Sequence, residues 1–330
     1  MSQTPKIVTI FGGSGFVGRY IARRMAKQGW RVRVAVRRPN EAIFVRPYGV
    51  VGQVEPILAN IRDDASTRAA IAGADAVVNC VGILQEDSRQ KFQSVQADGA
   101  GRIARIAAEE GVRQLVHISA IGADADSPSA YARTKAEGEA QVLAAFPKAV
   151  ILRPSILFGN EDQFFNRFAM IAKFSPVIPL VGPATKFQPV FVDDVAQAAE
   201  KACLGQVKAG TYELGGPEAE TFEQLIDRML TSIRRSRFKI PVPFFLARIK
   251  GKSLDLVQKL TGGLFTNTIL TADQVELLKS DNVVAKGAKT FADLGIEPTP
   301  MSAVIDDYLY RHRPYGQYTA LTESSRKIQS

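Results

Sequence analysis

Cysteine and histidine are scarce in this 330-residue chain. The cysteines are Cys80 and Cys203, and the histidines are His117 and His312. So few thiols and imidazoles exclude a disulfide framework and a clustered zinc site. We therefore expect no bound metal, and we interpret the chain as a protein of a reducing compartment.

Long hydrophobic runs and targeting signals are lacking as well. No stretch reaches the roughly 18–20 apolar residues that a membrane-spanning helix needs. The longest candidate, Phe174 to Thr185, carries three prolines. The N-terminus shows no positively charged n-region, cleavage site or arginine-rich presequence. We predict a protein that is neither secreted nor membrane-spanning, although it can lie against a membrane.

The composition is that of a globular protein with a sizeable core, with 46% hydrophobic and 23% charged residues. The first half alternates strand and helix patterns, as a parallel sheet with crossover helices requires. The strand patterns cover Lys6–Phe11, Arg31–Val36, Val54–Leu58, Ala76–Cys80, Gln114–Ser119 and Ala149–Arg153. The helical patterns cover Phe16–Lys27, Thr67–Ala72, Gln93–Glu110 and Ala130–Phe146. We predict an α/β fold, a Rossmann-type doubly wound parallel sheet with a small, mostly helical C-terminal lobe.

The patterns become less regular after Pro154. Four prolines interrupt residues 175–192, and a helix at Asp193–Leu204, a strand at Thr211–Leu214 and a helix at Phe222–Arg234 follow. We predict that residues 1–155 form the nucleotide-binding domain and that residues 186–214 return to it. Residues 156–185 and 215–330 would then form the C-terminal lobe, which faces a membrane or a partner.

A glycine-rich turn lies between the first strand and the first helix. It contains Gly12, Ser14, Gly15, Phe16, Val17 and Gly18. Glycines there permit a tight turn and let backbone amides approach a pyrophosphate, and the helix N-terminus favours the anion. Strand, spacing and helix agree, so we predict a dinucleotide site.

The end of the second strand indicates which dinucleotide is bound. NAD sites usually carry an acid there, which hydrogen-bonds the ribose 2′-hydroxyl. This chain has Arg37 and Arg38 instead. Two guanidiniums suit a 2′-phosphate, so we predict NADPH as the cofactor. The alternative is that both arginines face solvent.

Further cofactor contacts follow from the topology, because ligands bind outside the carboxyl ends of the strands. Asn60 and Ile61 follow the third strand, where an adenine would lie. Cys80, Val81 and Gly82 follow the fourth, where a backbone without bulky side chains can pass the ribose. Cys80 is also open to interpretation as a small buried hydrophobe.

The order of these motifs resembles that of the extended or atypical short-chain dehydrogenases/reductases. The glycine turn, Asn79–Gly82, Tyr131–Lys135 and Phe191–Val195 stand in that family's order. The resemblance implies that Tyr131 donates or accepts a proton, that Lys135 lowers its pKa and holds the nicotinamide ribose, and that a nearby hydroxyl orients a substrate. Tyr131 and Lys135 are four residues apart and share one helix face.

The position of the hydroxyl that would orient a substrate differs from the family pattern. The usual position looks like Ala120, with Ser119 one residue early, and adjacent strand residues point to opposite faces. Ser119 can serve if the strand has ended there. The candidate catalytic residues are therefore Tyr131, Lys135 and Ser119, and a cofactor clamp without turnover is at least as good a reading. We interpret His117 as a core residue of the same strand.

A narrower resemblance extends over nearly the whole chain. Ala145–Ser155, Phe158–Phe164, Gln188–Val192 and Arg311–Tyr315 are similar to segments of the NADPH-binding accessory subunits of respiratory complex I, the NADH:ubiquinone oxidoreductase. The resemblance implies a peripheral subunit with tightly held NADPH off the electron path, and other complex I subunits as partners. It implies the cytoplasmic face of a bacterial inner membrane, or the matrix face if organellar. We also include Pro154, Ser155 and Ile156 among the cofactor-binding residues.

Residues 234–252 form a basic segment with seven cations and no acid, interspersed with large apolar residues. The segment lacks a nucleic-acid-binding motif, so we expect no nucleic-acid partner. Phe244, Phe245, Leu246 and Ile249 can be core of the small lobe. They can equally be an interfacial element whose cations meet anionic headgroups. The complex I resemblance favours contact with a membrane or a membrane-bound partner.

Three functions therefore remain open. The first is a complex I subunit whose NADPH is structural and which has no turnover of its own. The second is a free NADPH-dependent reductase or epimerase that uses Tyr131 and Lys135. The third is a redox-sensing protein that exchanges NADPH and NADP⁺ readily.

Overall fold

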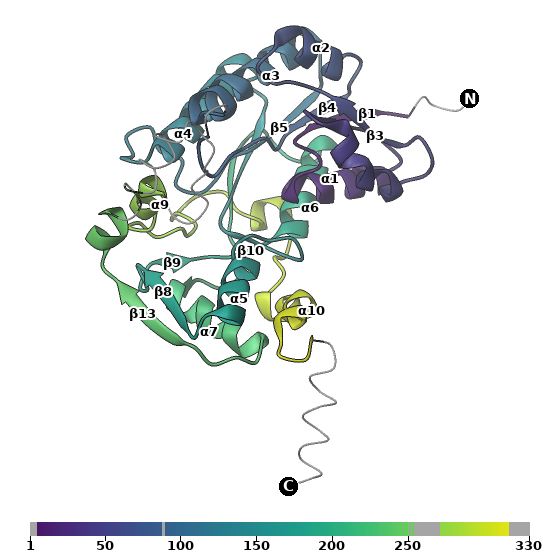
Figure 1. Ribbon diagram of the computed structural model, residues 1–330. Coiled ribbons are helices and arrows are strands. Elements are labelled where there is room, and N and C mark those ends of the chain that lie inside the picture. Colours follow the sequence, from purple (N-terminus) through teal and green to yellow (C-terminus); the bar gives the residue numbers. More distant parts are fainter. Residues whose placement is uncertain (1–4, 88–89, 250, 252, 254–270, 317–330) are drawn as a thin grey trace.

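The larger lobe is built on a seven-stranded parallel sheet (Figure 1). The computed structural model describes residues 5–87, 90–249, 251, 253 and 271–316. The strands lie in the order β11-β6-β5-β4-β1-β2-β3. Their bounds are β1 (Ile7–Phe11), β2 (Arg31–Val36), β3 (Val54–Leu58), β4 (Ala76–Asn79), β5 (Gln114–Ile118), β6 (Val150–Pro154) and β11 (Gly210–Leu214). The chain order reverses between β1 and β4, which is where ligands bind in such sheets.

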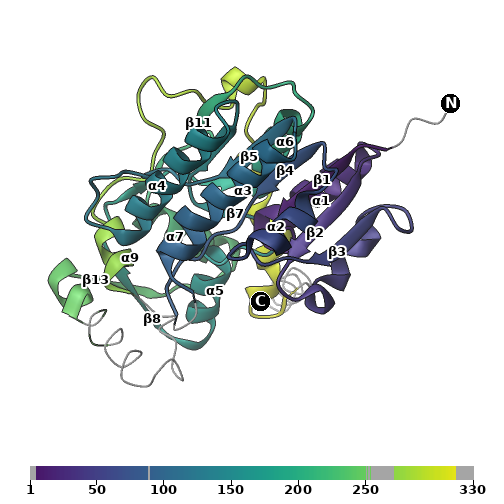
Figure 2. The same cartoon turned by 90° about the horizontal axis from the view of Figure 1, so that it is seen from above.

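Helices cover both faces of this sheet (Figures 1 and 2). One face carries α1 (Phe16–Lys27) and α6 (Val192–Cys203), which pack on a core that includes Ile10, Ile21 and Leu152. The other face carries α2 (Asp64–Ile71), α3 (Asp98–Glu109) and α4 (Ala130–Ala145) over a second core. The 3₁₀ helix η1 (Pro39–Tyr48) lies beside β2 and β3. Burial on both faces explains why the strands read as continuous apolar runs.

The smaller lobe has its own hydrophobic core, rich in phenylalanine. Its helices are α5 (Phe165–Phe174), α7 (Phe222–Ser232) and α10 (Ile305–Leu309). Its strands form three pairs, namely β7 (Leu157–Phe158) with β10 (Val190–Phe191), β9 (Lys186–Phe187) with β12 (Glu220–Thr221), and β8 (Val177–Val181) with β13 (Phe238–Val242). Residues 244–249, after β13, are helical. The remaining elements are α9 (Ala272–Leu277) and the short helices η3 (Ala292–Leu294), η4 (Met301–Ala303) and η5 (Tyr310–His312).

Part of the C-terminal chain returns to the larger lobe. A parallel bridge joins Tyr212 in β11 to Lys289. Phe291, Leu294 and Ile296 are buried in the same core as α1 and α6. The prediction that assigned residues 215–330 to the smaller lobe did not include this return, which apolar burial beside α6 stabilises.

The α/β Rossmann-type prediction is confirmed, with local differences in the elements. Helix α2 begins at Asp64 rather than Thr67 because the Asp63 carboxylate accepts a hydrogen bond from Ser66 N (2.6 Å) and caps the helix. The helix predicted over Gln93–Glu110 divides into a π-helical turn, η2 (Gln93–Ala97), and α3. Strand β8 forms despite Pro179, because each strand of a two-stranded pair has one edge without ladder bonds. Among the described residues, no helix is long and apolar enough to cross a bilayer.

Candidate functional site

The backbone of the glycine turn packs directly on other backbone segments, at Cys80 and within the turn itself. Gly12 has φ +73° and donates its N–H to Ala35 O (3.0 Å). A Cβ on Gly12 would lie 3.2 Å from the carbonyl of Cys80, and a Cβ on Gly18 would lie 2.4 Å from Gly12 O. The turn therefore requires glycine at both positions, one for its backbone conformation and one for space.

Helix α1 presents its N-terminus to the same place. Its N-cap is Gly15, which has no side chain to accept the first-turn N–H groups, and the first turn carries no acid. Such an N-terminus favours an anion. The guanidinium of Arg19, in α1, donates to Ser14 O (3.0 Å) and Gly15 O (3.3 Å) and so braces the turn. Arg19 was not identified from the sequence, because arginines on helices are common.

The two arginines after β2 lie on the surface. Arg37 and Arg38 are exposed. Arg38 pairs with Glu41 at 3.0 Å, but both side chains are more than two-thirds exposed, at 74% and 69%. Exposed pairs of this kind contribute little, so the contact does not lock Arg38 away from a ligand. The 2′-phosphate reading and the solvent-facing reading both remain compatible with this geometry.

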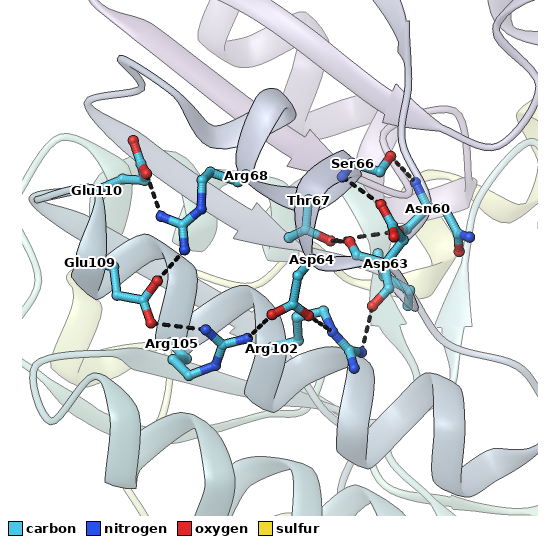
Figure 3. Close-up of polar contacts among 11 residues, drawn as sticks. Asn60, Asp63, Asp64, Ser66, Thr67, Arg68, Arg102, Arg105, Glu109 and Glu110 are labelled. Carbon is cyan, nitrogen blue, oxygen red and sulfur yellow. Dashed lines mark hydrogen bonds and ion pairs between the residues drawn. The ribbon is translucent and has the colours of Figure 1, made fainter.

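The loop after β3, where an adenine is predicted, is held by a dense set of hydrogen bonds (Figure 3). Asn60 N donates to Ser66 Oγ (2.9 Å), and Thr67 Oγ1 donates to Asn60 O (3.3 Å). The carbonyl of Ile61 accepts a hydrogen bond from Arg102 Nη1 at 2.9 Å. Residues of α2 and α3 therefore hold the conformation of this loop.

Ion pairs between α2 and α3 fix this arrangement (Figure 3). The Asp64 carboxylate bonds both Arg102 and Arg105, and these hydrogen bonds hold the pKa of Asp64 below its usual value. Arg68 of α2 likewise bridges to Glu109 and Glu110 at the end of α3. These ion pairs were not predicted from the sequence because they join residues about 40 positions apart.

The loop after β4 runs close to Lys135. Val81 N donates to Asn79 Oδ1 (3.0 Å), which fixes the turn out of the strand. A Cβ on Gly82 would lie 3.4 Å from Lys135 Nζ. Desolvation raises the pKa of the half-buried Cys80 thiol to about 12, which agrees with its interpretation as a small hydrophobe.

Tyr131 and Lys135 lie one turn apart on α4, as the sequence predicts. Lys135 is buried, its Nζ donates to Ile118 O (3.2 Å), and desolvation lowers its pKa to about 8. Tyr131 packs edge-on against Phe92, with ring centroids 5.8 Å apart. Burial, followed by the charge of Asp273, raises the pKa of Tyr131 to about 12. This direction is opposite to that of an activated tyrosine.

Strand β5 ends at Ile118, so Ser119 is the first residue beyond it. Ser119 is buried, and its Oγ has no hydrogen-bond partner among the described residues. The strand-end condition for Ser119 is therefore met. His117 is buried beside Asn79 (3.1 Å), and desolvation lowers its pKa to about 3, as expected of a neutral core residue.

The residues after β6 meet the C-terminal chain. Pro154 ends β6, and Ser155 donates its hydroxyl to Asn282 Oδ1 (2.7 Å) and Asn282 O (3.0 Å). Asn282 Nδ2 in turn donates to Ile121 O at 3.2 Å. Ile156 follows and packs on the core of the smaller lobe. Asn282 thus binds the loops after both β5 and β6, a contact that no sequence motif indicates.

The candidate residues converge on the carboxyl ends of the strands and fit a dinucleotide. The glycine turn and Gly82 place backbone without side chains at these strand ends, and the buried Ser119 hydroxyl, just after β5, has no hydrogen-bond partner among the described residues. Within the described ranges, no group of three or more His, Cys, Asp or Glu residues could hold a metal.

This fold, with its glycine turn and its Tyr–Lys pair on the helix after β5, is that of an extended short-chain dehydrogenase/reductase. Residues 8–215 match the NAD dependent epimerase/dehydratase family. The fold is similar to that of the solved structure of gox2253, with 19% identity, a TM-score of 0.70, and 94% of this chain and 99% of that one covered. It is also similar to UDP-glucose 4-epimerase of Thermus thermophilus in complex with NAD, with 20% identity, a TM-score of 0.58, and 72% and 86% covered.

Two curated relatives are similar over nearly the whole chain. The mitochondrial NADH dehydrogenase [ubiquinone] 1 alpha subcomplex subunit 9 of Arabidopsis thaliana is 34% identical, with 97% of this chain and 81% of the relative covered. The mitochondrial NADH-ubiquinone oxidoreductase 40 kDa subunit of Neurospora crassa is 31% identical, with 97% and 83% covered. The chain therefore belongs to the NAD dependent epimerase/dehydratase family and, within it, to the group of these NADH:ubiquinone oxidoreductase subunits.

From the burial of the Lys135 amine we predict a pH-dependent loss in the free energy of unfolding of the nucleotide-free protein. Burial lowers the pKa of Lys135 from the usual 10.5 to about 8, so the amine binds a proton less tightly in the folded state than in the unfolded chain. The cost is full below about pH 8 and disappears as the pH rises toward 10.5. Lys135→Met should therefore raise the free energy of unfolding at pH 7 by on the order of 2 kcal/mol, after loss of the bond to Ile118. Urea denaturation at pH 7 and pH 10 measures it.

The gain from Lys135→Met should be mostly gone at pH 10. The matched control is Lys148→Met, at an exposed lysine of the same lobe. A gain of equal size at both pH values would mean that packing, not the buried charge, explains the effect.

Proposed function

We propose that this chain is a peripheral accessory subunit of respiratory complex I that holds NADPH for structure, assembly or stability rather than for electron transfer. The observation that carries the proposal is the 34% identity to a complex I subunit over 97% of the chain. The match extends through the smaller lobe, beyond the residues 8–215 that the wider family shares. Other complex I subunits would be its partners.

The site supports a retained nucleotide more than a turned-over substrate. Tyr131 has a raised pKa, and Ser155 is bound to Asn282. In contrast, the glycine turn, the α1 N-terminus and the braced loop at Asn60 are preorganised for a dinucleotide. When bound, NADPH would offer hydride chemistry, whereas the residues of this chain would hold it. Gly12, Gly15 and Gly18 would admit the pyrophosphate, and Lys135 would hold the nicotinamide ribose.

Bound nucleotide would stabilise the fold by mass action, since only the folded state binds it. At a free concentration of 100 times Kd, the gain is about 2.7 kcal/mol. The nucleotide would also contact the loops after β1, β2, β3 and β4 together, and so add to the direct contact that Gly12 already makes with the Cys80 carbonyl. This is how a cofactor off the electron path can still be required for the subunit.

Assembly in complex I is tested by a native gel of mildly solubilised membranes from the source cell. We expect the chain to migrate at high mass together with NADH dehydrogenase activity. Migration as a small soluble species, with the activity elsewhere, would contradict the proposal. It would direct attention to the alternative, a free NADPH-dependent reductase or epimerase, in which Tyr131→Phe should abolish NADPH oxidation.

The choice of NADPH over NADH is tested at Arg37. Reversing this charge should repel a 2′-phosphate and leave a 2′-hydroxyl little affected. We expect Arg37→Glu to weaken NADPH binding at least about tenfold and to reduce the NADPH-induced rise in Tm, with little change for NADH. Calorimetric titration and thermal melts measure both. Arg31→Glu, at the exposed start of the same strand, is the control.

If Arg37→Glu and Arg31→Glu had the same effect on NADPH binding, Arg37 would not contact the phosphate. Equal losses for NADPH and NADH would point to a damaged fold. The first result would favour the interpretation in which the arginine pair faces solvent, whereas the second would contradict the assignment of Arg37 to the 2′-phosphate alone.

We further propose that the outer edge of the smaller lobe contacts an anionic membrane surface. The edge is formed by β13 and the helical residues 244–249 (Figure 1). Several of its apolar side chains are exposed, namely Phe238, Ile240, Phe245, Leu246 and Ile249. Phe244 is half-buried. The core reading of this cluster therefore applies at most to Phe244.

The cations of this edge are only partly neutralised. Lys239 pairs with Glu223 (2.7 Å) and Asp227 (2.8 Å) of α7. Arg235 and Arg237 donate to backbone carbonyls, which leaves their charge uncompensated by these bonds. Arg248 is exposed. Each basic residue near an anionic surface contributes about 1 kcal/mol. Lys250 and Lys252, counted in the basic segment, lie outside the described residues.

Membrane contact is tested by vesicle flotation of the full chain. Phe245→Ser with Ile249→Ser should weaken binding to anionic vesicles by more than about tenfold, because burying each large side chain contributes about 1.5–3 kcal/mol. NADPH should stay bound. The control, Val50→Ser with Val51→Ser, removes apolar side chains of the larger lobe that are even more exposed. Equal binding by both double variants would exclude this edge, and unfolding of the first would restore the core reading.

A further inference from the structure

The helix that carries Tyr131 and Lys135 is capped by a carboxylate from a distant part of the chain. Asp273, in α9, accepts hydrogen bonds from the backbone N–H groups of Ala130 (2.7 Å) and Tyr131 (3.3 Å). It also accepts one from Ser129 Oγ at 2.8 Å. Ser129 is the N-cap of α4, so Asp273 fixes both the cap and the first turn. The contact joins residues more than 140 positions apart.

The position of Asp273 depends on how α9 is seated. Val275, in the middle of α9, is fully buried. Thr271 and Gln274 form a capping box, which fixes the first turn around Asp273. Helix α9 therefore presents the carboxylate as part of a packed element, not as a mobile surface side chain.

Both ends of α9 contact the region around the basic segment. A Cβ on Gly251 would lie 2.9 Å from Ala272 N, so the backbone at Gly251 rests directly on the start of α9. At the other end, Leu278 O accepts a hydrogen bond from Thr185 Oγ1 at 2.6 Å. A Cβ on Gly182, in the same loop, would lie 2.9 Å from the ring of Phe244.

We propose that Asp273 is a positioning residue through which α9 and the basic segment control how tightly the nucleotide is held at Tyr131 and Lys135. When α9 is seated, its carboxylate orients the first turn of α4 and with it the side chain of Tyr131. When α9 is displaced, the cap is lost and the side chain of Tyr131 is no longer held in this orientation, while the glycine turn is unaffected. The inference rests on the proposed NADPH-holding function and adds its regulation.

The coupling is reciprocal, because binding free energies are linked. If a seated α9 tightens NADPH, then NADPH stabilises the seated α9. Amide hydrogen exchange in residues 271–278 should therefore slow when NADPH is bound, although these residues lie outside the predicted nucleotide contacts.

The main experiment measures the rate of NADPH release from the full chain by stopped-flow fluorescence with excess NADP⁺ as competitor. Asp273→Asn keeps the size of the side chain and removes the charge from three hydrogen bonds. We expect release to be about tenfold faster. Asp273→Glu should restore most of the native rate, since it restores the carboxylate.

Asp281→Asn is the matched control. Its carboxylate accepts a hydrogen bond from Lys186 N (2.8 Å) in the same stretch of chain. It should leave the release rate unchanged. A fall in the Tm of the nucleotide-free protein by Asp273→Asn, with native NADPH release, would reduce Asp273 to a structural cap and overturn the inference.

A second variant acts on α9 from the other side. Gly251→Val would push the start of α9 away without touching α4 and should also speed NADPH release. If both variants act through the seating of α9, the double variant should release NADPH no faster than the faster single variant. Additive effects would mean separate causes and would contradict the proposal. Circular dichroism checks that each variant is folded.

The measured release rates distinguish a failure of this inference from a failure of the proposed NADPH-holding function. A native protein that releases NADPH within the mixing time contradicts the proposed NADPH-holding function itself. Tight retention by the native protein, Asp273→Asn and Gly251→Val alike contradicts only the role of Asp273.

Discussion

The close approach of the β1–α1 turn to the end of β4 is the constraint on which the larger lobe depends. Gly12 touches the Cys80 carbonyl, and Gly18 lets the first turn of α1 pass over Gly12. At these distances a Cβ atom has no place, so the turn is defined by backbone atoms. The same packing places the α1 N-terminus beyond the carboxyl end of β1, next to the point where the strand order reverses. Arg19 and the loop at Asn60 add rigidity around this point.

The C-terminal chain makes the second set of defining contacts. Asn282 binds the loops after β5 and β6, and Asp273 caps the helix that carries Tyr131. Both residues belong to a segment that passes between the lobes before it joins the core beside α6. The loops after β5 and β6 and the start of α4 are therefore held by residues 273–282, whereas the glycine turn is formed by residues that are neighbours in the sequence. This division agrees with a protein that retains a nucleotide.

The sequence predicted the parts of the site that are local in the chain. The glycine turn, the pair Tyr131 and Lys135, and the buried strands could be identified because each depends on a fixed spacing within a few residues. Two of the differences from the prediction were local as well. Asp63 was not identified as the cap of α2, and Pro179 was taken to interrupt a region that forms β8. In both places a hydrogen-bonding partner, not the propensity of the segment, determined the outcome.

By itself, the sequence determined the fold class, the position of the glycine turn and the family to which the chain belongs. The tertiary structure alone decided that Asp273 caps α4, that Asn282 binds Ser155, and that Phe245 and Ile249 are exposed whereas Phe244 is half-buried. The physical reason is the range of the interactions. Periodicity and turn geometry depend on neighbouring residues. A helix cap, a hydrogen bond between loops and the burial of one phenylalanine depend instead on which distant segment packs beside these residues.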